Sequence, residues 1–296
     1  MAQPRRVTLR DISTDTGLSV AAVSYALRGL HVPEDTQARV RESAARLGYQ
    51  VDPIARALAS GRTGQVGVMC RSLADLWQQS MAADLGRALM RTGKLALIVD
   101  SGDDPGLEAR LARRLIDQRV DALIVLPVDV AAEHWAEIAA ATVLITVGDP
   151  IPEAETFGAV TFDNDQMVAA ALHDLMELGH RRIAVLTPIS SSLPDRAAER
   201  AVRKICASAS AAIALHFCPS DLPGAALVAA DLLSGPQRPT AFVCLSDSMA
   251  YGVYVAARRL GLVIPTDVSV LGNDANAVSA LLDPPLSTWQ WPMDDV

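Results

Sequence analysis

The sequence predicts an α/β core of two Rossmann-like lobes, preceded by a small all-α helix-turn-helix domain. From residue 65 onward, short apolar segments alternate with amphipathic helices, which is typical of parallel sheets covered on both faces. These segments outnumber the strands that one such sheet usually holds, so we expect two lobes that meet near Phe162–Asn164. Residues 7–29 indicate instead two short helices joined by a tight turn.

The two N-terminal helices are predicted from their caps. Thr8 can cap the first helix, and Asp11 stands three residues later as its capping-box partner. Gly17 supplies the turn, because a left-handed backbone is cheap only for glycine. Ser19 then caps a second helix, Val20–Leu27. In a helix-turn-helix this second helix lies in the major groove of DNA.

Two more helices are expected before the α/β core. Glu34–Leu47 has apolar residues on one face and ends at Gly48, so three helices together can bury a small common core. Pro53–Ser60 forms a further short helix after an extended connector. Eight residues make a marginal helix in isolation, so this one is expected to be ordered only when it packs on a partner.

The core is expected to contain nine strands. They are Val66–Cys70, Leu95–Val99, Ala122–Leu126, Val143–Val147, Ala159–Phe162, Ile183–Leu186, Ile213–His216, Ala241–Leu245 and Val268–Leu271. The helices expected between them include Met81–Arg91, Leu107–Asp117, Gln166–Leu178 and Ser248–Leu260. Open sheets of this kind bind ligands at the carboxyl ends of their strands.

Charge is divided unevenly along the chain. Residues 1–63 carry a net charge of +3 and the remaining 233 residues a net charge of −11. A protein that is acidic overall argues against nucleic-acid binding, but the field that matters is that of the domain touching DNA. A basic N-terminal module on an acidic body therefore fits DNA binding at one end only.

The sequence lacks the motifs that indicate several other classes of function. The four cysteines form no CxxC pair and are expected to be buried free thiols in a reducing cytoplasm. We expect neither a signal peptide nor a membrane span, because no apolar run is long enough. The sequence has no glycine-rich phosphate loop, no GxSxG and no metal-spaced His/Cys cluster, so we expect neither an enzyme, a cofactor nor a metal site.

Several motifs, in order along the chain, resemble the LacI/GalR family of transcriptional regulators. In the N-terminal part these are Thr8-Leu9-Arg10-Asp11-Ile12, Gly17-Leu18-Ser19-Val20, Val23-Ser24, Leu27, Gly29, Leu47-Gly48-Tyr49 and Ala55-Arg56-Ala57-Leu58. In the core they are Leu178-Gly179-His180-Arg181-Arg182-Ile183, Asp247-Ser248-Met249-Ala250-Tyr251-Gly252, residues 261–270 and Pro284-Pro285-Leu286-Ser287-Thr288. The resemblance covers nearly the whole chain. It implies a homodimeric repressor whose core is periplasmic-binding-protein-like (type I).

The resemblance also implies a domain division and a set of partners. Residues 1–50 would form the DNA-binding domain, residues 51–63 the linker and hinge helix, and residues 64–296 the domain that binds an effector and dimerises. This last domain is expected to be shortened at its C-terminus, because relatives continue through another helix and strand. The expected partners are a palindromic duplex operator, a small effector such as a sugar or nucleobase, and a second copy of the chain.

The DNA-contacting residues follow from this resemblance. They are Thr8, Ser19, Val20, Ala21, Ser24, Tyr25, Arg28, Thr36, Tyr49, Arg56 and Leu58. Val20 and Ala21 occupy the positions that read base edges; both are small and apolar, so they can touch thymine methyls but cannot form bidentate hydrogen bonds. Thr8, Ser19 and Thr36 would hold phosphates. A role as helix caps alone is the alternative for Thr8 and Ser19.

The short helix has its own expected role. The resemblance implies that the paired helices of a dimer enter the minor groove, where Leu58 is pushed into the central base step. An apolar wedge of this kind kinks DNA. Arg56 on the same helix would follow the phosphates. Without the resemblance, a leucine here is more often part of a core or an interface.

The effector-binding residues are expected between the lobes. Trp77, Arg196 and Asp274 match the family's aromatic, basic and acidic cleft positions, and an Arg and an Asp facing each other suit polyhydroxy ligands. Weaker candidates are Asp75, Ser192, Ser246 and Trp291. The alternatives are a core role for the lone Trp77 and surface ion pairs for Arg196 and Asp274.

The leading hypothesis is a repressor whose affinity for DNA is controlled by a small ligand. A solute-binding protein with no DNA role is the alternative, which the absence of an export signal and the basic N-terminal module oppose. An α/β enzyme is a third and weaker possibility.

Overall fold

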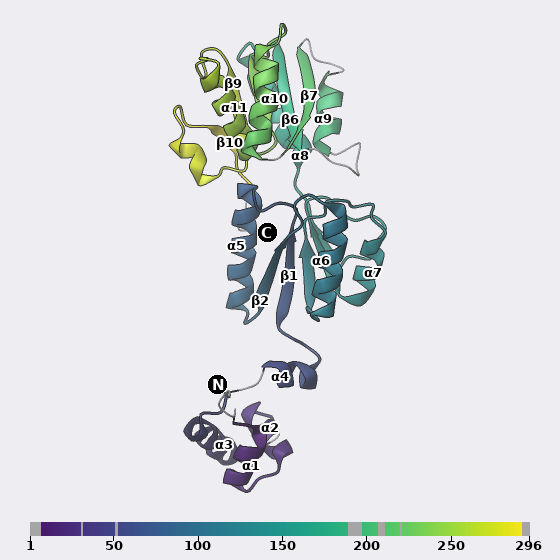
Figure 1. The fold of residues 1–296 in the computed structure, drawn as a ribbon, viewed down its shortest axis with the longest axis vertical. Coiled ribbons are helices and arrows are strands. Elements are labelled where there is room, and N and C mark those ends of the chain that lie inside the picture. The colour runs from purple at the N-terminus through teal and green to yellow at the C-terminus, as the bar shows by residue number, and fades with distance from the viewer. Residues whose placement is uncertain are drawn as a thin grey trace, which may run out of the picture. The chain divides into compact units, whose positions relative to one another are not determined.

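The computed structural model describes residues 7–30, 32–50, 53–188, 197–206, 211–219 and 221–291. The chain folds into two compact units, residues 1–63 and 64–296 (Figure 1). The first unit is helical, and the second contains two parallel sheets. Within the described residues, no helix combines the length and the apolar character needed to cross a lipid bilayer.

Three helices form the core of the first unit. They are α1 (Leu9–Thr16), α2 (Val20–Leu27) and α3 (Glu34–Leu47), and a fourth, α4 (Pro53–Ser60), follows. The fully or almost fully buried side chains are Ile12, Val23, Ala26, Val40 and Ala44. Each of the first three helices contributes to this set, so the unit is held together by one small apolar cluster.

Local signals in the sequence define where these helices begin and end. The Asp11 carboxylate accepts hydrogen bonds from the backbone N–H and the hydroxyl of Thr8, at 2.7 and 2.8 Å. Gly17 has a φ of 69°, as the expected turn requires. The hydroxyl oxygen of Ser19 accepts a hydrogen bond from the backbone N–H of Ala22 at 3.2 Å and caps α2.

The first lobe of the second unit is a five-stranded parallel sheet in the order β2-β1-β3-β4-β5. Its strands are β1 (Gln65–Cys70), β2 (Leu95–Asp100), β3 (Ala122–Val125), β4 (Val143–Val147) and β5 (Gly158–Val160). Its helices are α5 (Leu76–Arg91), α6 (Pro105–Asp117) and α7 (His134–Ala141). Leu123 and Val125 pack toward α6 and α7, whereas Ile124 packs with Met81 of α5, so both faces of the sheet are covered.

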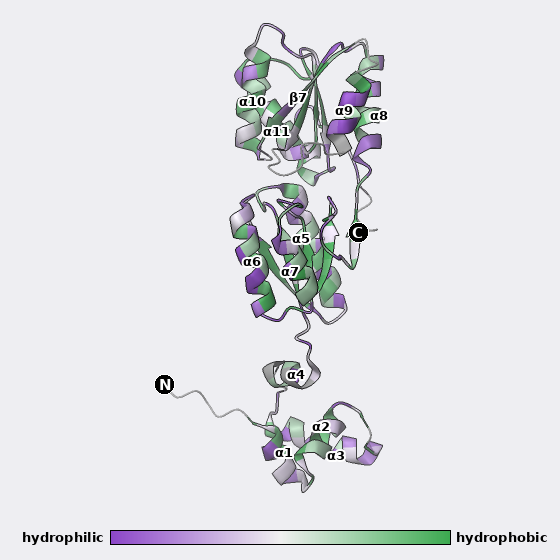
Figure 2. Cartoon of the chain, turned by 90° about the vertical axis from the view of Figure 1, so that its right-hand side faces the viewer, coloured by the Kyte–Doolittle hydropathy of each residue, from purple (hydrophilic) through white to green (hydrophobic). Residues whose placement is uncertain are grey.

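The second lobe repeats this architecture with the order β10-β9-β8-β6-β7. Its strands are β6 (Arg182–Pro188), β7 (Ala212–Cys218), β8 (Ala241–Cys244), β9 (Ser269–Asn273) and β10 (Ser287–Trp289). Its helices are α8 (Asn164–Glu177), α9 (Ala197–Cys206), α10 (Leu222–Ser234) and α11 (Asp247–Arg259), with a 3₁₀ turn at Ala277–Leu281. Buried residues of α10 and α11 pack on one face and those of α8 and α9 on the other. In Figure 2 the interior strands are hydrophobic, and α9 carries a hydrophilic band.

The predicted lobes and strands are confirmed, with small differences in bounds. Phe162, expected in the fifth strand, lies beyond the end of β5 in the segment that leads into the second lobe. The strand at Ser287–Trp289 was not predicted, because the sequence Ser-Thr-Trp contains no apolar run.

His180, in the motif Leu178-Gly179-His180-Arg181-Arg182-Ile183, connects separate segments of the second lobe. Its two ring nitrogens lie 2.9 Å from the hydroxyl of Thr240 and 3.0 Å from the hydroxyl of Ser269. The turn after α8 is thereby tied to the residue before β8 and to the first residue of β9. Partial burial lowers the pKa of His180, which favours the neutral ring in these contacts.

Candidate DNA-binding surface and ligand pocket

Helix α2 has one buried face and one exposed face. Val23 and Ala26 are fully buried in the three-helix core. On the other side, Val20 is 40% exposed and Tyr25 is 45% exposed, and Ala21 is also exposed. An α-helix with a solvent-accessible side of this kind can enter a major groove without unfolding the core.

Tyr25 and Arg28 lie together on this exposed face. The guanidinium carbon of Arg28 lies 5.3 Å from the centre of the Tyr25 ring, and Arg28 Nε donates a hydrogen bond to the Ser24 carbonyl. A cation held against a tyrosine ring keeps both groups in a defined orientation. The aromatic side chain and its neighbouring positive charge therefore form one feature of the surface.

The other predicted DNA contacts take different places. Thr8, Ser19 and Arg56 are exposed, and Ser24 and Thr36 are half-buried. Tyr49 is half-buried against the three-helix core. Leu58 belongs to α4, but its side chain lies outside the described part of the chain. The roles of all eleven residues in binding DNA stay predictions.

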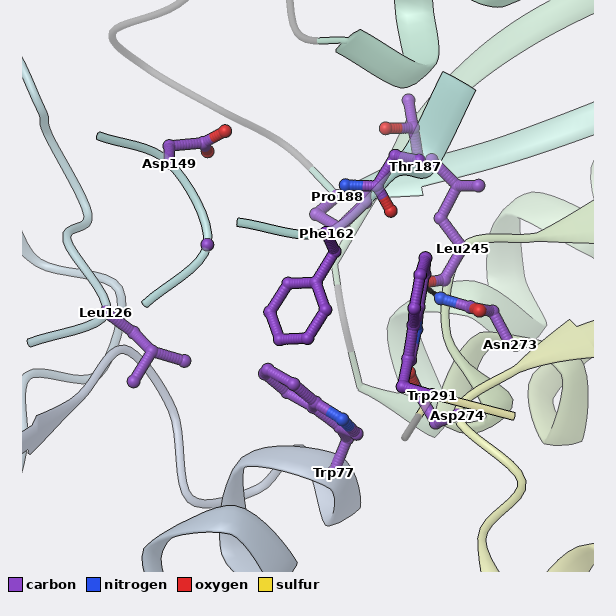
Figure 3. Close-up of a pocket in the computed structure, with 12 residues that line it drawn as sticks. Trp77, Leu126, Asp149, Phe162, Thr187, Pro188, Leu245, Asn273, Asp274 and Trp291 are labelled. Atoms are coloured by element: carbon purple, nitrogen blue, oxygen red, sulfur yellow. Dashed lines mark hydrogen bonds between the residues drawn. The ribbon is translucent and has the colours of Figure 1, made fainter. Parts of the chain in front are cut away.

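The second unit contains a pocket of about 180 Å³ between its lobes (Figure 3). Its lining residues are Trp77, Leu126, Gly148, Asp149, Phe162, Asn164, Thr187, Pro188, Leu245, Asn273, Asp274 and Trp291. Most of them lie at or just beyond the carboxyl ends of β3, β4, β6, β8 and β9. This is the position in which parallel sheets bind ligands.

Three aromatic rings, which we call the aromatic cage, line one side of this pocket: Trp77, Phe162 and Trp291. The Trp77 and Phe162 ring centres are 5.4 Å apart with an interplanar angle of 79°, and those of Phe162 and Trp291 are 5.1 Å apart at 57°. Figure 3 shows the Phe162 ring beside both indoles. Trp77 comes from α5 of the first lobe, whereas Trp291 packs with the core of the second lobe.

Unsatisfied polar atoms accompany these rings. Asn273 is 4% exposed, and its side-chain oxygen Oδ1 has no hydrogen-bond partner among the described residues. The indole nitrogen Nε1 of Trp77 is likewise buried without a described partner. Buried polar atoms are rarely left unpaired, so these two atoms indicate where a ligand or an ordered water can bind.

Acidic side chains dominate the charge near the pocket. Burial raises the pKa of Asp274 well above its usual range, and the charges of Asp75 and Asp247 raise it further. Burial also raises the pKa of Asp75. Asp274 has a φ of 124°, a conformation that is strained for a residue with a side chain. Both its backbone and its ionisation are thus set by the surrounding structure.

Asp247, the first residue of α11, holds the loop that carries Asp274. Its carboxylate accepts hydrogen bonds from the hydroxyls of Ser279 and Thr288, both at 2.6 Å, and from the backbone N–H of Asn276 at 2.8 Å. The backbone N–H of Asp247 donates to Asp274 Oδ2 at 3.3 Å. One fully buried carboxylate thereby fixes both the loop after β9 and strand β10.

Two of the predicted effector residues cap helices instead. Asp75 is 6% exposed and accepts a hydrogen bond from the backbone N–H of Gln78 at the start of α5. Ser246 caps α11 by accepting from the backbone N–H of Met249. Neither residue lines the pocket. Ser192 and Arg196 lie outside the described residues.

Trp77, Asp274 and Trp291 line the pocket, and their role in binding an effector stays a prediction. Phe162 and Asn273 were missed as site residues. The predicted meeting point of the lobes at Phe162–Asn164 contained a signal for the first, because a ring at such a junction borders the cleft. Asn273 carried no comparable signal, since a residue at the end of a strand can face either side of the sheet.

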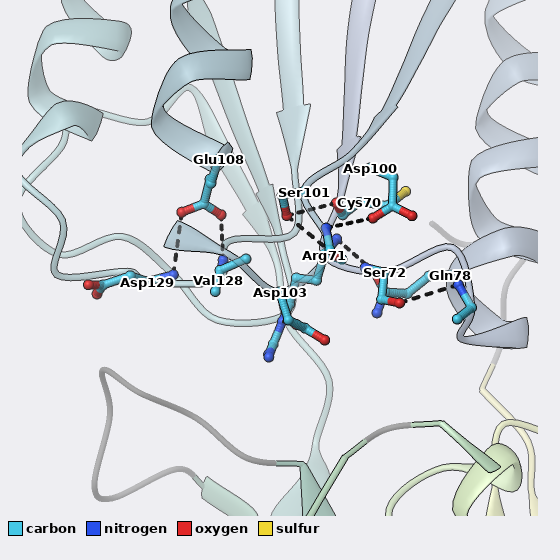
Figure 4. A network of polar contacts seen from close by, with 12 residues as sticks. Cys70, Arg71, Ser72, Gln78, Asp100, Ser101, Asp103, Glu108, Val128 and Asp129 are labelled. Carbon is cyan, nitrogen blue, oxygen red and sulfur yellow. Dashed lines mark hydrogen bonds and ion pairs between the residues drawn. The ribbon is translucent and has the colours of Figure 1, made fainter. Parts of the chain in front are cut away.

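A second polar network lies at the same end of the first lobe's sheet (Figure 4). Arg71 Nε donates to Asp103 at 2.8 Å, and the backbone N–H of Arg71 donates to Gln78 Oε1 at 2.9 Å. The buried Glu108 carboxylate accepts hydrogen bonds from the backbone N–H groups of Val128 and Asp129. These contacts order the loops that follow β1, β2 and β3. Within the described ranges, no three His, Cys, Asp or Glu residues are grouped to hold a metal ion.

Comparisons with known proteins agree with this architecture. A periplasmic binding protein-like domain family matches residues 172–296. Catabolite control protein A of Priestia megaterium is 26% identical over 298 residues, which cover 98% of this chain and 89% of that protein. The transcriptional repressor PurR of Vibrio atlanticus is 27% identical over 299 residues, covering 96% and 87%. The crystal structure of the Lac repressor dimer bound to operator and an anti-inducer superposes with a TM-score of 0.83 at 24% identity, covering 98% of this chain and 88% of that one.

The class of protein follows from the fold and the site together. The chain combines a helix-turn-helix module with a two-lobed, periplasmic-binding-protein-like body that has a pocket between its lobes. In sequence and fold it is similar to transcriptional regulators of the LacI/GalR family.

Proposed function

We propose that this protein is a cytoplasmic transcriptional repressor that binds a palindromic DNA operator as a homodimer and is controlled by a small ligand. The observation that carries the proposal is the exposed face of α2 on an otherwise well-packed three-helix unit. The related proteins named above are repressors or control proteins, and the Lac repressor structure contains a dimer on its operator. These names favour a regulator over a plain solute-binding protein.

On DNA, α2 would lie in the major groove. Val20 and Ala21 would contact thymine methyl groups, and Tyr25 with Arg28 would contact a phosphate or a base edge. The N-terminal end of α2 is capped by Ser19 and has no acidic residue in its first turn, so its free N–H groups favour a phosphate. Leu58 of α4 would be the wedge in the minor groove.

A second copy would cover an apolar surface of the second lobe. Leu281 is 82% exposed, Val263 55% and Val278 40%, and all three border one groove together with Tyr254 and Arg258. An exposed apolar patch rimmed by polar residues is typical of a protein–protein interface. The Lac repressor dimer is the precedent for a second copy as the occupant.

Ligand control would act through the pocket between the lobes. A ligand that binds one arrangement of the lobes more tightly than another shifts the population toward that arrangement. The same coupling must change DNA affinity and ligand affinity by the same factor. The aromatic cage and the polar atoms beside it support a ring-shaped ligand such as a sugar or a nucleobase.

The test is DNA binding by the purified full-length protein. Operator fragments selected from random DNA should show binding by fluorescence anisotropy, with an affinity that falls steeply as salt is raised, because phosphate contacts release counterions. Tyr25→Ala should weaken binding at least tenfold without unfolding the protein. If no DNA is enriched by a folded dimer, the proposal is wrong.

Ser19→Ala separates capping from phosphate binding. Losing the cap alone should cost about 1 kcal/mol of helix stability, whereas Ser19→Asp keeps a capping oxygen and adds a negative charge. We expect Ser19→Asp to fold normally but to bind DNA more weakly than Ser19→Ala. Equal DNA binding by the two variants would show that Ser19 is only a cap.

A further inference from the structure

We propose that the pocket between the lobes binds an organic ammonium ligand, whose positive charge lies against the aromatic cage and beside the carboxylate of Asp274. This inference rests on the proposed ligand-binding role of the pocket and adds the charge of the ligand. It is supported by the charge of the lining, by the unpaired acceptor atom of Asn273 and by the arrangement of the rings.

The described lining contains negative but no positive side chains. Asp149 and Asp274 are among its twelve residues, and none of the twelve is Lys, Arg or His. A second hollow shares Trp77, Asp274 and Trp291 with the pocket, and its described lining also lacks a basic residue.

The negative charges of neighbouring acidic groups act together at Asp274. Asp274 is near enough to Asp75 and Asp247 for their charges to raise its pKa. The hydrogen bond that Asp274 Oδ2 accepts from the backbone N–H of Asp247 is long, at 3.3 Å. Arg71, which lowers the pKa of Asp75, is itself paired with Asp103 at 2.8 Å. A bound cation would favour the ionised form of Asp274, whereas an anion would be repelled.

The rings supply the second half of a cation site. Trp77, Phe162 and Trp291 meet at angles of 79° and 57° rather than in a flat stack, so their faces point in different directions around the pocket. Aromatic faces attract cations, and sets of such rings recognise quaternary ammonium groups. The unpaired Oδ1 of Asn273, a 4% exposed residue, adds an acceptor for a polar group of the same ligand.

The test compares ligands that differ only in charge. Choline and 3,3-dimethylbutan-1-ol have the same shape, with N⁺ in the first where the second has carbon, and 3,3-dimethylbutanoate supplies an anion. Glucosamine and glucose give a matched pair for a sugar ring. By titration calorimetry with the full-length protein, we expect each ammonium compound to bind at least tenfold more tightly than its neutral partner, and the anion not to bind.

Variants locate the effect. Asp274→Asn should reduce choline affinity about tenfold and leave the affinity for the neutral isostere unchanged. Asp117→Asn, on the exposed end of α6, should change neither affinity. Choline has no titratable proton, so proton release on binding, measured in two buffers of different ionisation enthalpy, would come from the protein. Because the pKa of Asp274 is raised, we expect proton release with wild type and less release with Asp274→Asn.

Each result decides the proposal. If neither choline nor glucosamine binds more tightly than its neutral partner, or if Asp274→Asn affects both partners equally, the proposal is wrong. DNA binding by the same preparations is measured separately. Operator binding with no preference for ammonium compounds would overturn this inference alone, whereas a wild-type protein that binds no DNA would overturn the proposed function.

Discussion

Glu108 is a buried acid in the core of the first lobe. Its carboxylate accepts hydrogen bonds from the backbone N–H groups of Val128 at 2.5 Å and Asp129 at 3.4 Å, and His134 Nε2 lies 3.8 Å away. The side chain is fully buried, and burial raises its pKa to about 7. Burial lowers the pKa of His134, which disfavours a charged imidazolium beside Glu108.

This raised pKa predicts a pH dependence of stability. A carboxyl whose pKa is higher in the folded than in the unfolded protein binds more protons when folded, so stability falls as pH rises from 4.5 to about 7. The expected loss is about 3 kcal/mol. Glu108→Gln should remove this part of the decline. All four tryptophans lie in residues 64–296, so urea unfolding followed by tryptophan fluorescence at several pH values reports this unit.

The control is Glu155→Gln, at an exposed position of the same lobe. It should leave the pH profile of the wild type unchanged. If Glu108→Gln keeps the full decline between pH 4.5 and 7, Glu108 does not titrate as its burial implies.

At the scale of elements, helices α10 and α11 pack unusually closely. A Cβ atom on Gly252 would lie 2.7 Å from the Cβ of Ala225 and 2.7 Å from the backbone nitrogen of Ala226. Contacts this short require the helices to move apart. The glycine in the sequence Tyr251-Gly252 is therefore a packing requirement of the second lobe's core.

Gly252→Ala should destabilise the second unit by about 1–3 kcal/mol. Gly86→Ala in α5 is the matched control, because its new Cβ would have no neighbour closer than 3.9 Å. Removing a helical glycine there should stabilise by about 0.5–1 kcal/mol. Chemical denaturation of both variants measures the difference. Equal effects would mean that the helices adjust freely.

The elements were predicted from sequence wherever a local signal marks them. Helices α2, α3 and α4 have the predicted bounds, because serine, proline or glycine residues stand at their ends. Most strands were located from their apolar runs. Strand β10 was not, since its pairing with β9 depends on contacts distant in sequence. The pocket was predicted in part: Trp77 and Asp274 came from the family resemblance, whereas Asn273 became a candidate only through its unpaired oxygen.

At the scale of the whole molecule, the proposed dimer makes the exposed apolar residues of the second lobe testable. Leu281→Asp would place a charge in the centre of the interface, where an unpaired buried charge is costly. We expect sedimentation velocity to show a dimer for wild type and a monomer for this variant. Operator affinity should fall with it, because one half-site is then bound alone.

Leu178→Asp gives the matched control, since Leu178 is 77% exposed at the end of α8 and outside the groove. This variant should remain a dimer. A wild-type protein that sediments as a monomer at micromolar concentration, or a Leu281→Asp variant that stays dimeric, would place the interface elsewhere.

Helix α4 has a consequence for how strongly a ligand can act. Its eight residues, Pro53–Ser60, lie at the C-terminal end of the first unit, which ends at residue 63, and an isolated helix of this length is close to the balance point between coil and helix. Little free energy is then needed to shift this segment from coil to helix or from helix to coil. A regulator with such a segment would repress less tightly but respond more easily to its ligand. Ala-rich substitutions that raise the helix propensity of α4 should therefore make repression tighter and induction harder to achieve.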